Sequence, residues 1–140
     1  MSRFSVFRSL AVALGAISTV AACGGGGTNG NTGAGDAGCT VKGSATAAVT
    51  PTVVSNVVPD PNTVGRFTPN NMTVKVGQSI EWDWQDPNVA HTVTSDDGTT
   101  FDSCLQNKGY KFVVTFNQAG KLPYHCTIHP QMTGLVRVLH

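Results

Sequence analysis

Hydrophobic and polar residues alternate along most of the chain beyond residue 66, as in β-strands that bury one face. In one stretch Ile80, Trp82 and Trp84 alternate with Glu81 and Asp83. The period of two recurs in five further sets of inward-facing positions: Met72, Val74 and Val76; His91 and Val93; Phe112, Val114 and Phe116; Leu122, Tyr124 and Cys126; Val136 and Val138. No window shows the sustained 3.6-residue period of a helix.

Turn-forming residues separate these alternating segments. Gly77-Gln78, Asp96-Asp97-Gly98 and Gln118-Ala119-Gly120 each lie between two of them, and Gly and Asx residues favour tight turns. Short strands joined in this way predict an all-β, antiparallel β-sandwich. The proline-rich stretch 59–62 is expected to break the N-terminal strands apart, because proline cannot donate a hydrogen bond within a sheet.

Residues 1–22 are expected to be a lipoprotein signal peptide. Arg3 and Arg8 precede an apolar run, residues 10–22, that is shorter than the roughly 20 residues of a membrane span but suits a signal peptide. The run ends in Val20-Ala21-Ala22-Cys23, which resembles a bacterial lipobox and implies a diacylglyceryl group on Cys23. We therefore expect a cell-envelope lipoprotein, facing the periplasm or on the outer surface. The alternative is an ordinary secreted protein with a cysteine near its cleavage site.

Residues 23–42 are predicted to be a lipidated cysteine followed by a flexible tether. Eight of the fifteen residues 24–38 are glycine, so this segment cannot bury enough apolar surface to offset its ordering entropy. The remaining residues, 43–140, are predicted to form a single domain. About one hundred residues are enough for one hydrophobic core.

The residues with distinctive chemistry lie mainly between positions 124 and 132. Cys126, His129 and Met132 offer a thiolate, an imidazole and a thioether, and His91 offers a second imidazole 35 residues before Cys126. Two His, one Cys and a weak axial Met are the ligands of a blue, type 1 copper electron-transfer centre, whereas structural zinc sites usually close with four Cys or His ligands. The alternative is that Cys126 and Met132 are ordinary core residues. It is weakened because each proposed ligand falls on, or just after, an inward-facing position.

Two other histidines are not expected to bind the metal. His125 is adjacent to Cys126 in a predicted strand, so its side chain should leave the opposite face. His140 is the last residue of the chain, where fraying is expected. His91 and His129 remain as the two imidazole ligands.

With these residues in view, the chain resembles the cupredoxins of the plastocyanin and amicyanin type over about residues 66–140. Met132 follows His129 by three residues, which is the spacing in amicyanin. The resemblance implies an eight-stranded Greek-key β-sandwich with one mononuclear copper at one end, and electron passage at the edge of the His129 ring. Besides the ligand loop, it rests on three segments: Phe67-Thr68-Pro69, Val74-Lys75-Val76-Gly77-Gln78-Ser79-Ile80-Glu81-Trp82 and His91-Thr92-Val93.

The chain departs from the family pattern at three positions. Thr92 stands where Asn is common, Ile128 where Pro is usual, and Cys104 near a usual Gly. The resemblance implies a hydrogen bond from the Thr92 N–H to the Cys126 sulfur. Since Ile128, unlike proline, has an N–H, we predict a second such bond that raises the reduction potential. The alternative is that the Ile128 N–H faces elsewhere.

The four cysteines suggest one disulfide. If Cys23 carries lipid and Cys126 binds copper, Cys39 and Cys104 remain, and an oxidising compartment makes their pairing plausible. Such a bond would pin the start of the domain to the loop before Lys108. The alternative is two independent thiols.

The expected function is the transfer of single electrons between periplasmic or membrane-associated redox partners, such as c-type cytochromes or a copper/haem oxidoreductase. The alternatives are a periplasmic copper-binding or copper-handling protein and a metal-free interaction module. We expect a monomer, and no enzyme, because the sequence offers no nucleophile–base pair and no open coordination position.

Charge adds one expectation about the partner. The net charge is +1, so nothing favours nucleic-acid binding. If the acidic residues between Lys75 and Lys108 cluster near the copper, they should steer a basic redox partner; the alternative is a solvated face. Six of the eight acidic residues lie there: Glu81, Asp83, Asp86, Asp96, Asp97 and Asp102.

Overall fold

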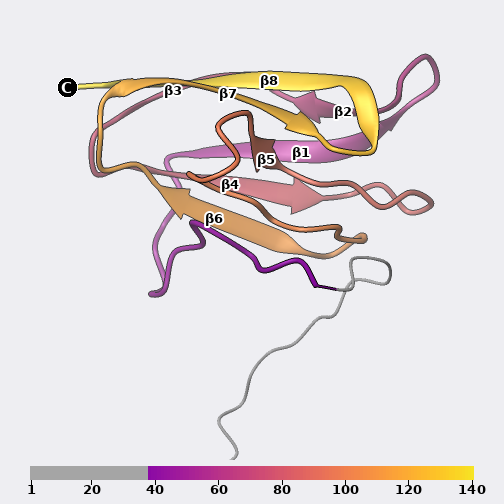
Figure 1. Cartoon of the computed structure of the whole chain (residues 1–140), viewed down its shortest axis with the longest axis horizontal. Coiled ribbons are helices and arrows are strands. Elements are labelled where there is room, and N and C mark those ends of the chain that lie inside the picture. The colour runs from indigo at the N-terminus through magenta and orange to yellow at the C-terminus, as the bar shows by residue number, and fades with distance from the viewer. Residues whose placement is uncertain (1–37) are drawn as a thin grey trace, which may run out of the picture.

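The computed structural model describes residues 38–140, so the predicted signal peptide, Cys23 and most of the predicted tether lie outside the described residues. Two four-stranded sheets pack face to face (Figure 1), with strand orders β2-β1-β4-β6 and β3-β8-β7-β5. The predicted all-β, eight-stranded sandwich is confirmed. The strands are β1 (Val53–Asp60), β2 (Val64–Thr68), β3 (Asn71–Lys75), β4 (Ser79–Trp84), β5 (Thr94–Ser95), β6 (Lys111–Thr115), β7 (Gly120–Cys126) and β8 (His129–Leu139).

The prediction of purely antiparallel pairing is wrong for two pairs of strands. β1 runs parallel to β4, and β3 runs parallel to β8. Parallel neighbours need a crossover connection. After β2 the chain crosses to the second sheet to form β3, and then returns to the first sheet to form β4. Alternation along one strand cannot reveal which distant strand will become its neighbour.

The core is built from the inward-facing positions that the alternation predicts. Trp82 lies at its centre, with ring centroids 5.5 Å from Phe101, 6.0 Å from Phe112 and 5.5 Å from Tyr124. Val76 is an exception, because it lies beyond the end of β3 and is 42% exposed. Among the described residues there is no helix, and so none that is long and apolar enough to cross a membrane.

The proline-rich stretch ends β1 but does not separate it from its neighbour. β1 and β2 form an antiparallel hairpin in which Pro59 lies opposite Gly65. Asp60 stabilises the turn, because its Oδ1 accepts hydrogen bonds from the backbone N–H groups of Asn62 and Thr63. The stretch thus breaks the chain between two strands, as expected, although the two strands then pair, and Pro59 lies beyond the last residue of β1 that pairs with β4.

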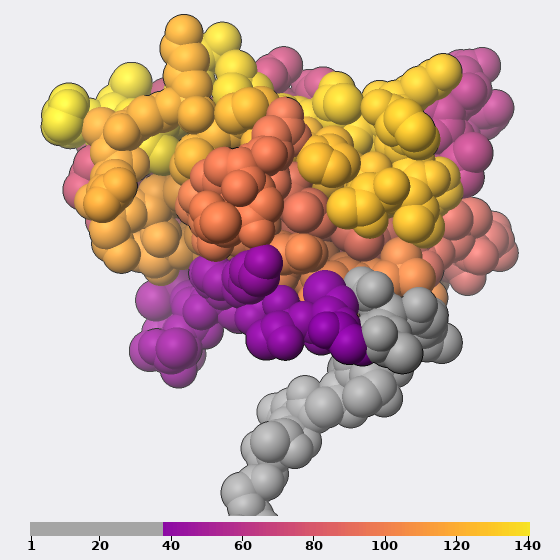
Figure 2. All heavy atoms as spheres, viewed as in Figure 1, coloured from indigo at the N-terminus to yellow at the C-terminus, as the bar shows by residue number. Residues whose placement is uncertain are grey.

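The first described residues are fastened to the domain. Cys39 forms a disulfide with Cys104, with the two Cα atoms 5.9 Å apart. Lys42 then pairs with Asp102 through two backbone hydrogen bonds of 2.8 and 3.1 Å. In Figure 2 these indigo residues lie as a strip across one face of the molecule. The segment 102–104 is thus held from outside by the start of the described chain.

Candidate metal centre

The hairpin between β7 and β8 brings two of the predicted ligands together at one end of the sandwich (Figure 1). Cys126 ends β7, His129 begins β8, and the two residues pair with each other after a register shift at His125/Cys126. The two-residue connection therefore sets the thiol and the imidazole side by side, with Sγ and Nδ1 3.4 Å apart.

The third predicted ligand reaches the same point from another part of the chain. The Nδ1 atom of His91 lies 3.1 Å from the Nδ1 atom of His129. The ligand atoms of His91, His129 and Cys126 all lie within 4.8 Å of one another. Met132 lies in β8, in the same hairpin, and its side chain is 2% exposed.

His125 points to the opposite face from Cys126, as the alternation predicts. Its Nδ1 atom lies 2.6 Å from Oδ1 of Asp96, and both side chains are substantially exposed to solvent. His140 is also exposed. Neither histidine belongs to the cluster of possible ligands.

His91 is buried and held on several sides. Its backbone N–H and C=O both bond to Gln106 at 3.0 Å, and the Trp84 indole N–H donates to its carbonyl at 3.0 Å. The ring nitrogen Nε2 lies 3.0 Å from Oδ2 of Asp86. Gly65 lies so close to the ring that an added Cβ would be 2.3 Å from the His91 Cε1 atom. The ligand is fixed by its backbone, its second nitrogen and the space that Gly65 leaves.

Sequence reasoning missed these supporting residues. Asp86 lies five residues before His91 and was counted only as part of an acidic segment, and Gly65 lies in a different strand. A carboxylate close to a predicted histidine ligand was the available signal, because metal-bound histidines commonly donate their other N–H to a carboxylate.

The ionisation of the cluster favours metal binding. Burial alone would raise the pKa of the Cys126 thiol, but its interactions with His91, with the Thr92 and Ile128 amides and with His129 lower it to about 6. Burial would lower the pKa of His91, yet its contacts with Cys126 and Asp86 raise it. The cysteine is thus readily available as a thiolate, the form that binds metals.

The carboxyl group of Asp86 is held in its charged form. Burial acts to raise its pKa, but hydrogen bonds from His91 and from the Asn88 and Val89 amides outweigh burial and lower the pKa. Asp86 is 1% exposed, so this carboxylate faces protein groups rather than water.

Backbone and hydroxyl groups join the two segments that carry the ligands. The Thr92 N–H donates to the Cys126 sulfur at 3.3 Å. The Thr92 hydroxyl accepts a 2.8 Å bond from the Thr127 N–H and donates to the Thr127 hydroxyl at 3.2 Å. Threonine at position 92 can therefore link the two segments where the family often has asparagine.

The ring of His129 lies at the surface, unlike that of His91. A shallow pocket of ≈ 280 Å³ runs past it, with Val64, Ile128 and Pro130 among its lining residues. Val64 and Ile128 are each 50% exposed, and we call these two side chains the apolar rim. Val64 has a φ of 69°, which is rare for a β-branched residue and costs backbone energy.

The acidic residues do not form one exposed cluster. Glu81 and Asp83 both pair with Lys111, at 2.5 and 3.4 Å, and Asp86 is buried behind His91. Asp97 is engaged by the backbone N–H groups of Thr99 and Thr100. Several of these charges are thus already paired or buried, which favours the alternative of a solvated face over a cluster that steers a partner.

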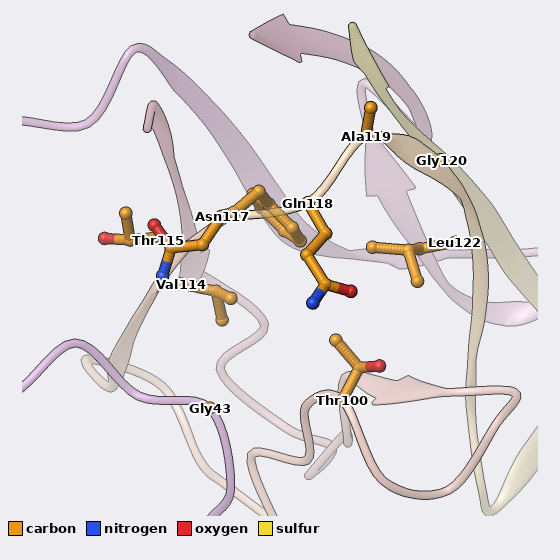
Figure 3. Close-up of a pocket in the computed structure, with 10 residues that line it drawn as sticks. Gly43, Thr100, Val114, Thr115, Asn117, Gln118, Ala119, Gly120 and Leu122 are labelled. Atoms are coloured by element: carbon orange, nitrogen blue, oxygen red, sulfur yellow. The ribbon is translucent and has the colours of Figure 1, made fainter. Parts of the chain in front are cut away.

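A second pocket lies far from this centre, at the turn between β6 and β7 (Figure 3). Its volume is ≈ 300 Å³, and Gln118 and Leu122 point into it across from Thr100. It is lined by no titratable or metal-binding side chain, so the ligand chemistry belongs to the opposite end of the sandwich.

Comparison with known proteins agrees with this geometry. Residues 54–139 match the family described as copper binding proteins, plastocyanin/azurin family. Amicyanin from Paracoccus versutus is 30% identical over 95 residues, which cover 63% of this chain and 72% of amicyanin. The chain therefore belongs to the plastocyanin/azurin family of copper-binding proteins.

Solved structures of cupredoxins share the fold. A purple cupredoxin from Nitrosopumilus maritimus superposes with a TM-score of 0.51 at 29% identity, covering 60% of this chain and 98% of that one. A copper-containing nitrite reductase from Thermus scotoductus gives a TM-score of 0.51 at 25% identity, but the match covers only 24% of the reductase. This chain therefore corresponds to about one quarter of that enzyme.

The residues present fit the single type 1 copper that this family binds. A soft thiolate and two imidazole nitrogens converge, and such ligands suit copper. Asp86 engages the Nε2 atom of His91, which leaves the Nδ1 atom free to face the metal. The chain is thus a copper-binding electron-transfer protein.

Proposed function

We propose that this protein carries single electrons between redox partners in the bacterial cell envelope, and that Met132 is the weak axial ligand beside His91, Cys126 and His129. One observation carries the proposal. The three strong ligand atoms converge, yet one imidazole is fully buried and the other reaches the surface. This arrangement suits a site that exchanges electrons without admitting a substrate.

Each residue has a defined part in this function. Copper, when bound, supplies a couple between Cu(II) and Cu(I). His91 and its hydrogen bonds hold the inner side of the site fixed, which limits rearrangement when the oxidation state changes. The His129 ring provides the path to the surface, and the apolar rim lets a partner approach without desolvating charged groups.

The location and partners follow from the sequence. The lipobox-like Val20-Ala21-Ala22-Cys23 favours attachment of the mature chain to a membrane through Cys23. Suitable partners are c-type cytochromes or a copper/haem oxidoreductase, met by the protein as a monomer. Since Glu81 and Asp83 pair with Lys111 and Asp86 is buried, contact at the apolar rim is a better basis for docking than charge steering.

Copper handling is the alternative, and the structure disfavours it. Proteins that deliver copper usually use exposed, Met-rich sites, whereas His91 is 0% exposed and Met132 is 2% exposed. Catalysis is not proposed either, because four protein ligands leave no position for a substrate.

The decisive experiment combines spectroscopy with kinetics. Cu(II) added to the purified protein should produce an intense visible thiolate-to-copper band and a reversible one-electron voltammogram, with Cys126→Ser as the control that shows neither. Stopped-flow mixing with a basic c-type cytochrome should show fast oxidation or reduction at a rate that changes little with salt. Rapid loss of copper to a chelator, without electron exchange, would favour copper handling instead.

A further inference from the structure

Asp86 is a buried carboxylate with few partners. Burying a charge is costly unless it is paired and hydrogen-bonded. The Oδ1 atom accepts bonds from the Asn88 and Val89 N–H groups at 2.9 and 3.1 Å. The Oδ2 atom faces only the His91 ring, at 3.0 Å, and no Lys or Arg of the described chain pairs with this carboxylate. A negative charge is therefore kept directly behind the innermost copper ligand.

We propose that Asp86 is a positioning residue for the metal centre, which fixes the tautomer and orientation of His91 and lowers the reduction potential. This inference rests on the proposed copper function. Asp86 thus acts on the reduction potential in the opposite direction to the hydrogen bonds to the Cys126 sulfur, because those bonds favour the reduced state.

The hydrogen bond to Asp86 fixes the tautomer of neutral His91. A neutral imidazole carries one N–H, and an ionised carboxylate can only accept. The proton of His91 therefore lies on Nε2, and the lone pair of Nδ1 faces His129 and Cys126, whose ligand atoms are adjacent. Such a partner also raises the basicity of a histidine ligand.

The charge of Asp86 acts on the reduction potential through electrostatics. A fixed negative charge stabilises the doubly charged oxidised ion more than the singly charged reduced ion, and the effect is larger away from water. Asp86 and His91 are 1% and 0% exposed. The carboxylate therefore favours Cu(II) and lowers the potential.

The most informative substitution is Asp86→Asn. The two backbone donors at Oδ1 should retain the amide oxygen, so the new NH₂ group would face His91 Nε2. His91 would then have to accept at Nε2 and carry its proton on Nδ1, where it competes with the metal. We expect Cu(II) affinity to fall about 10- to 100-fold and the potential to rise by about 59 mV for each tenfold change in the ratio of Cu(II) to Cu(I) affinity.

A second variant separates the charge from the tautomer. Asp86→Ser can still accept from the backbone N–H groups but is too short to reach His91. Its potential should also rise, with a smaller loss of affinity than in Asp86→Asn. Asp86→Glu, which keeps the charge, should retain a potential closer to that of the wild type. Asp96→Asn is the matched control, because Asp96 also bonds a histidine but is exposed.

The readouts are the midpoint potential by voltammetry, Cu(II) affinity by competition, and the imidazole ¹⁵N spectrum of the metal-free protein at a pH high enough that His91 is neutral. The wild type should carry the His91 proton on Nε2, and Asp86→Asn should move it to Nδ1. A wild-type proton on Nδ1 would overturn the proposal. So would reduction potentials of Asp86→Asn and Asp86→Ser that equal the wild-type potential. A wild-type protein that fails to form the blue site would instead refute the proposed function.

Discussion

The two histidines proposed as copper ligands direct the same ring nitrogen toward one another, yet their surroundings differ. Their Nδ1 atoms lie 3.1 Å apart. His91 is 0% exposed and is fixed by Gln106, Trp84 and Asp86, whereas His129 begins a strand beside a pocket that opens to solvent. In the proposed function, one imidazole therefore fixes and tunes the centre while the other gives access to it.

The strongest test of this division removes each imidazole in turn. Both His91→Gly and His129→Gly should lose the blue absorption, because each removes a strong ligand. Imidazole added to the solution should restore the band in His129→Gly, where the gap opens to solvent, but not in His91→Gly, where it is enclosed. Absorption titrations make the comparison. Equal rescue of both variants would mean that the two sides are equally accessible.

The next test fills the space beside the buried ring. In Gly65→Ala the new Cβ would lie 2.3 Å from the His91 Cε1 atom, so the ring must shift. We expect copper affinity to fall at least about tenfold, as for loss of an outer partner of a ligand. Gly120→Ala is the control, because a Cβ there meets nothing within 4 Å. Equal affinities in the two variants would show that His91 tolerates displacement.

A smaller change is expected on the exposed side, at Ile128. The Ile128 amide contributes to lowering the pKa of Cys126, and Ile128→Pro removes that N–H. The thiolate then donates more strongly to Cu(II), so the potential should fall, by about 59 mV if the ratio of affinities changes tenfold. Ile128→Ala keeps the N–H and should leave the potential nearly unchanged. An unchanged or higher potential in Ile128→Pro would show that the Ile128 N–H does not raise the reduction potential.

The smallest expected effect concerns the apolar rim. Val64→Asn places a residue that tolerates positive φ at an angle of 69°, so it should stabilise the domain by about 1 kcal/mol. It should also slow electron exchange with a cytochrome, because the rim becomes polar. Val76→Asn, a substitution at another exposed valine, is the control for both denaturant melts and stopped-flow rates. An unchanged exchange rate in Val64→Asn would remove Val64 from the docking surface.

Comparing the two sides also shows how far sequence reasoning reached. Cys126, His129 and Met132 could be predicted as a group, because they are neighbours in the chain and share one short hairpin. The surroundings of His91 could be predicted only in part. His91 could be chosen by its place in an alternating segment, but Gly65, Trp84 and Asp86 contact it through packing among separate elements.

Local sequence was enough to predict the faces of the strands, the outward direction of His125 and the set of candidate ligands. These follow from the period of two and from side-chain chemistry, which neighbouring residues encode. Local sequence could not predict that β1 and β3 pair in parallel with β4 and β8, or that Asp86 lies behind His91. These contacts join segments whose neighbours are determined by the packing of the whole sandwich.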